Sequence, residues 1–129
     1  MNKFIFLFFP LFLFAVFINP PFKFSLKKDR YAYFTLYYKG FKSNIKIRWT
    51  LYINDVLNVI YFRDNFPRQV TLFNTYAMNW FKINITDFPD FNPVLYVKVN
   101  KFSPDLVEFE IYLNKKYEKK IKIDYKGKK

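Results

Sequence analysis

Apolar and polar side chains alternate with a period of two along most of the chain after residue 30. In the clearest example, Ile45 to Ile53, every second residue is isoleucine, tryptophan or leucine, and the residues between them are lysine, arginine, threonine and tyrosine. Successive side chains of a strand point to opposite faces of a sheet. The pattern therefore predicts a β-strand with one buried face and one wet face.

The same alternation recurs in a series of short segments separated by turn-forming residues. The predicted strands are 31–39, 45–53, 56–62, 69–73, 79–85, 94–99, 107–113 and 120–125. About seven or eight short strands with turns every 8 to 12 residues are typical of an all-β fold. We therefore predict an antiparallel β-sandwich with immunoglobulin-like architecture, and the alternative is a small closed β-barrel.

Turn chemistry predicts the register of two hairpins. A two-residue turn at Asn54-Asp55 would place Trp49 opposite Ile60 on the inner face. In the last hairpin, a loop at residues 114–116 would place Phe109 opposite Ile121. The outer faces of those two strands would then pair glutamates 108 and 110 with lysines 122 and 120, which favours the same register.

Before the predicted strands lies an unbroken apolar run from Phe4 to Ile18. Its fifteen residues are too few for an ordinary spanning helix, which needs about 20, so the length favours a signal peptide. The cleavage pattern is poor, because Ala15 is the only small residue before Ser25. An uncleaved anchor, with the domain on either side of the membrane, remains the alternative. We divide the chain into a signal peptide or anchor at 1–22 and a single basic β-rich domain at 23–129.

The chain contains no histidine and no cysteine. It therefore lacks the commonest general base and metal ligand, the thiolate nucleophile, and any disulfide framework. The two glycines form no phosphate-binding loop, and the three serines lie in no nucleophile motif. We predict a protein that is not an enzyme, with no catalytic, cofactor-binding or metal-binding residues.

The formal net charge is +12, and lysines become frequent toward the C-terminus. A surface this positive attracts anions such as lipid head groups or acidic polysaccharide. Lysines of this kind also serve simply to keep an aromatic-rich domain soluble. The candidate anion-binding residues are Lys115, Lys116, Lys119, Lys120, Lys122, Lys126, Lys128 and Lys129.

Aromatic residues make up 25% of the chain, and several tyrosines fall on predicted outward faces. The candidates are Tyr31, Tyr33, Tyr37 and Tyr52. Exposed tyrosines among cations can stack on bases or sugars, and they can equally form a packed outer layer or a belt at a membrane interface.

These features together predict a basic β-domain that is exported across a membrane or anchored in one, on the periplasmic or extracellular side. We expect it to be a non-enzymatic binding module for a partner protein, anionic lipid or polysaccharide. If residues 4–18 are uncleaved, they would hold the protein in the membrane. One alternative is a cytoplasmic-facing barrel that binds single-stranded nucleic acid. Another is a structural assembly subunit that pairs through strand edges.

Overall fold

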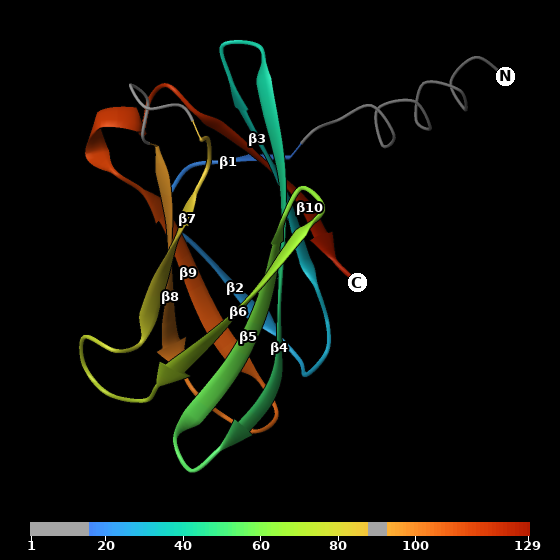
Figure 1. The fold of residues 1–129 in the computed structure, drawn as a ribbon, viewed down its shortest axis with the longest axis vertical. Coiled ribbons are helices and arrows are strands. Elements are labelled where there is room, and N and C mark those ends of the chain that lie inside the picture. Colours follow the sequence, from blue (N-terminus) through green and yellow to red (C-terminus); the bar gives the residue numbers. More distant parts are fainter. Residues whose placement is uncertain (1–15, 88–92) are drawn as a thin grey trace, which may run out of the picture.

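A computed structural model describes residues 16–87 and 93–129, and these residues form two antiparallel β-sheets packed face to face (Figure 1). The predicted antiparallel β-sandwich is confirmed, and the sheets do not close into a barrel. The described residues contain ten strands, more than the seven or eight that the sequence indicates. The extra strands are β1 and β2, which lie before residue 30.

The larger sheet has six strands in the order β1-β10-β3-β4-β5-β6. Their bounds are β1 Phe17–Ile18, β10 Lys122–Lys128, β3 Ala32–Tyr38, β4 Phe41–Ile53, β5 Val56–Arg63 and β6 Phe66–Phe73. The smaller sheet has four strands in the order β2-β9-β8-β7. Their bounds are β2 Phe22–Leu26, β9 Val107–Leu113, β8 Val94–Lys101 and β7 Trp80–Asn84. A short 3₁₀ turn, η1 (Lys115–Tyr117), lies between β9 and β10.

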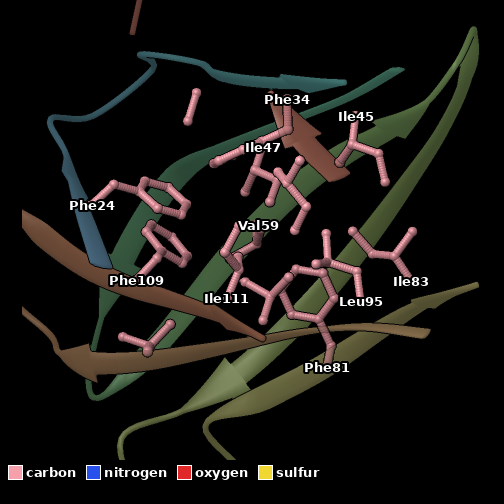
Figure 2. Packing of buried hydrophobic residues seen from close by; sticks show 14 of the residues in the cluster. Phe24, Phe34, Ile45, Ile47, Val59, Phe81, Ile83, Leu95, Phe109 and Ile111 are labelled. Carbon is pink, nitrogen blue, oxygen red and sulfur yellow. The ribbon is translucent and has the colours of Figure 1, made fainter. Parts of the chain in front are cut away.

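The core fills the space between the sheets with aliphatic and phenylalanine side chains from both inner faces (Figure 2). Phe24 and Phe109 stack at 5.4 Å between ring centroids, and Phe34 lies 5.2 Å from Phe24 across the sheets. Trp49 is 1% exposed, and its Nε1–H donates to the carbonyl oxygen of Leu26 at 2.7 Å. This bond joins β4 of the larger sheet to β2 of the smaller one.

The two-residue turn at Asn54-Asp55 forms as predicted, with φ values of 53° and 63°. The predicted pairing of Trp49 with Ile60 is wrong, because Trp49 lies opposite Val59. The register shifts by one residue between Trp49 and Leu51, so β4 carries a bulge there. A bulge reverses the facing of every residue beyond it. Leu51 therefore becomes 44% exposed, although the alternation alone places it in the core.

The predicted hairpin of the last two strands is also wrong. Strand β9 pairs with β2 and β8, whereas β10 pairs with β1 and β3 in the other sheet. The connection through η1 crosses the edge of the sandwich and buries Tyr117. Both strands still turn their apolar residues inward, so the hydrophobic pattern is satisfied equally well. Glu110 finds opposite charges in its own sheet, since Lys23 and Lys98 lie opposite it.

The connections gather at two ends of the sandwich. At the upper end in Figure 1 lie the β3–β4 turn, η1 and strand β1, and at the lower end lie the β2–β3, β4–β5, β6–β7 and β8–β9 connections. Residues 1–15 of the predicted signal peptide or anchor lie outside the described residues. Within the described part of the chain, no helix has the length and apolar character needed to span a bilayer.

Candidate functional site

The eight candidate lysines of the C-terminal region do not form one patch. Lysines 115, 116, 119 and 120 belong to the β9–β10 connection at the upper end, and Lys122 begins β10. Lys126 and Lys128 lie further along β10, and Lys129 follows it, with its Nζ 5.6 Å from the Tyr33 ring centroid. Lys126 Nζ lies 2.6 Å from Asp124 Oδ2, and Lys128 Nζ donates to the carbonyl oxygen of Ser25 at 3.2 Å.

Two of the candidate lysines, Lys120 and Lys122, meet two lysines that sequence reasoning did not select. Lys39 and Lys42 from the β3–β4 hairpin join them around a shallow hollow of about 360 Å³, which we call the lysine hollow. Its other lining residues are Tyr37, Tyr38, Gly40 and Phe41. Among the described residues, no carboxylate lines it.

The β3–β4 turn shapes this hollow. Lys39 and Gly40 both have positive φ, at 41° and 83°, which is the conformation of a tight hairpin turn whose twist matches its strands. Glycine adopts this conformation without the steric cost that other residues meet. The turn brings Tyr38 opposite Phe41, while Lys122 of β10 lies opposite Tyr37 of β3. Two separate stretches of chain, the β3–β4 hairpin and the start of β10, thus place their cations on one end of the larger sheet.

Aromatic rings line and support the cations around the lysine hollow. Lys122 Nζ lies 5.9 Å from the centroid of the Phe17 ring, and Phe17 meets Tyr37 edge-on at 6.4 Å. Lys39 Nζ lies 5.4 Å from the Tyr38 ring centroid, and Lys120 Nζ lies 6.0 Å from that of Tyr117. Contact with the negative face of a ring holds an ammonium group without neutralising its charge. The hollow therefore keeps its full positive charge for an anion.

A second, larger hollow of about 580 Å³ lies between the edges of β6 and β7. It also contains cations, and the central one is Arg63. The Arg63 guanidinium donates to both carboxylate oxygens of Asp87 at 2.9 and 3.0 Å, and also to the carbonyl oxygen of Asn84 at 2.8 Å. Because an intramolecular carboxylate already occupies the guanidinium, this hollow is less suited to an external anion than the lysine hollow.

Two of the four candidate tyrosines form an outer layer on the larger sheet. Tyr31 and Tyr33 lie 5.8 Å apart, and Phe62 of β5 joins them at 6.3 Å from Tyr31. Lys46 Nζ lies 4.8 Å from the Tyr31 centroid and 4.3 Å from that of Phe62. The guanidinium of Arg48 also lies over Tyr31, at 5.0 Å. Side chains of the protein itself thus cover these rings.

The other two candidate tyrosines lie elsewhere. Tyr37 lines the lysine hollow. Tyr52, which the alternation places on the outward face, is partly buried and packs against the core, because it lies beyond the β4 bulge. There its ring lies 5.7 Å from Phe102, and its hydroxyl donates to Asp55 Oδ1 at 3.0 Å. Burial of the Tyr52 ring raises the pKa of its hydroxyl above the usual value.

Across residues 16–87 and 93–129, acidic side chains do not gather into a group of three that could hold a metal ion. No protein-family description, curated protein or solved structure matches this chain. The lysine hollow is therefore the candidate functional site on its geometry alone.

Proposed function

We propose that this protein is an exported or membrane-anchored, non-enzymatic domain that binds an anionic lipid surface through the lysine hollow. One observation carries the proposal: four lysines from separate stretches of chain converge on one hollow that has no described carboxylate. Lysines placed only for solubility would be expected to alternate with acidic residues across the surface. A convergent set attracts phosphate groups instead.

The position of the hollow also supports this function. Phe17 of β1 contacts both Tyr37 and Lys122, so the C-terminal end of the apolar run adjoins the hollow. Because Val16 to Ile18 are held on β10, a chain that leaves a bilayer before Val16 would carry the lysine hollow close to the head groups. Lysines 115, 116 and 119 lie at the same end of the sandwich and would widen the contact.

The expected strength follows from the number of lysines. A lysine close to an anionic leaflet contributes about 1 kcal/mol, so the four lysines of the hollow contribute about 4 kcal/mol. That free energy corresponds to roughly a thousandfold in affinity. Because the lysines are exposed to solvent, added salt screens the attraction and lowers the affinity.

Vesicle sedimentation tests the proposal with a matched pair of double variants. Lys39→Glu/Lys42→Glu alters the hollow, and Lys27→Glu/Lys28→Glu makes the same charge change in the β2–β3 turn at the opposite end. We expect the first variant to lose at least about 30-fold in affinity for phosphatidylglycerol vesicles, which corresponds to the roughly 2 kcal/mol supplied by two lysines. The second variant should lose much less.

Several outcomes would contradict this function. Equal losses in the two variants would mean that net charge alone drives binding, and equal binding to neutral phosphatidylcholine would remove the anionic requirement. Retention by an acidic polysaccharide but not by vesicles would replace lipid with polysaccharide as the ligand class.

Two other functions remain as proposals that the same protein can test. Binding of single-stranded nucleic acid requires a cytoplasmic domain, so a topology reporter fused after Lys129 discriminates it from the lipid function. Assembly through strand edges would instead give a concentration-dependent increase in mass in solution. Edge strand β6 carries Pro67 and Arg68, and such residues discourage edge-to-edge pairing.

A further inference from the structure

Asp124 is a buried carboxylate on the face of β10 that also bears Lys122 and Lys126. It is 1% exposed. Its Oδ1 accepts a hydrogen bond from the backbone N–H of Val16 at 2.9 Å. Its Oδ2 forms an ion pair with Lys126 Nζ at 2.6 Å, and no further donor among the described residues reaches it. The carboxylate is thus buried with part of its accepting capacity unused.

A single peptide N–H compensates the burial of this carboxylate only in part. Burying a carboxylate is unfavourable unless opposite charge and hydrogen bonds compensate it, and a carboxylate has about four acceptor sites. Lys126 supplies charge from a side chain that is 50% exposed. Val16 supplies one neutral donor. An ammonium group at the position of the Val16 nitrogen would supply a full charge and three donors.

Val16 is also the first described residue, and its backbone is bonded to β10. Its carbonyl oxygen accepts from the Tyr125 N–H at 2.8 Å, and the next two residues, Phe17 and Ile18, pair with Asp124 and Ile123. Ile18 packs against the core. A cut at the predicted 22/23 boundary would remove all of these contacts, whereas a cut before Val16 would keep every one of them.

We propose that the Ala15–Val16 peptide bond is a processing site and that Asp124 is the acceptor for the α-ammonium group that cleavage creates. Water adds its hydroxyl to the carbonyl carbon of Ala15, and the C–N bond breaks. The Val16 nitrogen takes the remaining proton and one more from solvent. Ala15 supplies the small residue directly before the cut, whereas Leu13 departs from the A-x-A pattern, so the contact of Val16 with Asp124 carries the inference. This inference rests on the proposed export, because a leader peptidase performs the cleavage.

Pairing with Asp124 has a measurable consequence for the new amino group. An α-amino group ordinarily titrates near 7.7 to 8.0, and a buried carboxylate partner would raise that pKa. The raised pKa means that the pairing stabilises the fold below about pH 7.7. The stabilisation disappears as pH rises through the raised value.

Expression of the full chain in a secreting bacterial host tests the processing site. The intact mass of the exported protein should correspond to Val16 as the first residue. Ala15→Tyr should block this cut, whereas Asn19→Tyr, on an exposed residue between β1 and β2, should not. An exported protein that begins elsewhere, or that retains Met1, would overturn the inference and leave the proposed export intact. A protein that stays in the cytoplasm would overturn both.

Amine labelling of the exported protein tests the role of Asp124. The α-amine should react at least about tenfold more slowly in the native protein than after unfolding, which corresponds to one unit of raised pKa. Asp124→Asn should abolish this protection. If that variant does not fold, the pH dependence of labelling in the wild type gives the α-amine pKa directly. A native value at or below 8.0 would refute the pairing.

Discussion

Replacing Trp49 with phenylalanine tests the physical link between the two sheets. In the wild type the indole Nε1–H donates to Leu26 at 2.7 Å across the core, and Trp49 is 1% exposed. Phenylalanine keeps an aromatic ring but has no donor. The variant therefore loses a buried hydrogen bond, which costs about 1 to 1.5 kcal/mol.

The smaller ring adds a second cost. It leaves unfilled space in a core where the surrounding strands relax only partly, and we assign this about 1 to 2 kcal/mol. The total is about 2 to 3.5 kcal/mol of unfolding free energy. For a domain of this size the urea midpoint should fall by about 1 to 2 M, because the urea dependence is about 1 to 3 kcal/mol/M.

The second tryptophan of the chain provides the control. Trp80 lies on edge strand β7 and is 42% exposed, so Trp80→Phe should change stability by no more than about 0.5 kcal/mol. Urea unfolding followed by far-ultraviolet circular dichroism measures both variants without relying on tryptophan fluorescence. If Trp49→Phe were as stable as Trp80→Phe, the bond between the sheets would not hold the sandwich as described.

Two further predictions concern backbone strain and alkaline pH. Ala77 has φ of 72° in an exposed loop, so Ala77→Gly should raise the unfolding free energy by about 0.5 to 1 kcal/mol in urea titrations, and a loss of stability would contradict the loop geometry. Burial raises the pKa of Tyr112 and of Tyr125, and a hydrogen bond to Asp124 raises the pKa of Lys126. Unfolding then releases protons at high pH, so the thermal midpoint should hold steady up to about pH 10 and fall above it; a midpoint that stayed level to pH 12 would refute these shifts.

The fold class follows from the sequence because local alternation decides which face of each strand is buried. Every predicted strand after residue 30 is present, and the Asn54-Asp55 turn forms where its residues indicate. The β4 bulge is invisible in the pattern, because Ile45 to Ile53 continues to alternate without interruption. Only pairing with β5 and the facing of Tyr52 reveal the extra residue.

Long-range pairing explains the remaining differences. The patterns of β9 and β10 are compatible with a hairpin and also with inward faces in opposite sheets, and alternation does not distinguish the two. The lysine hollow was missed for the same reason. Lys39 and Lys42 lie some 80 residues before Lys120, and only the pairing of β3 with β10 brings them together. Their local signal was a lysine beside a turn glycine, which is common on any surface.

The central claim is that the end of the sandwich bearing the lysine hollow faces an anionic membrane. The chain has no cysteine, so a single introduced cysteine places a fluorescent label uniquely. Lys119→Cys labels the β9–β10 connection beside the hollow, and Thr75→Cys labels the β6–β7 loop at the opposite end. Quenching by phosphatidylglycerol vesicles that carry head-group quenchers should be strong at position 119 and near zero at position 75. Equal quenching at both positions, or stronger quenching at 75, would contradict the account.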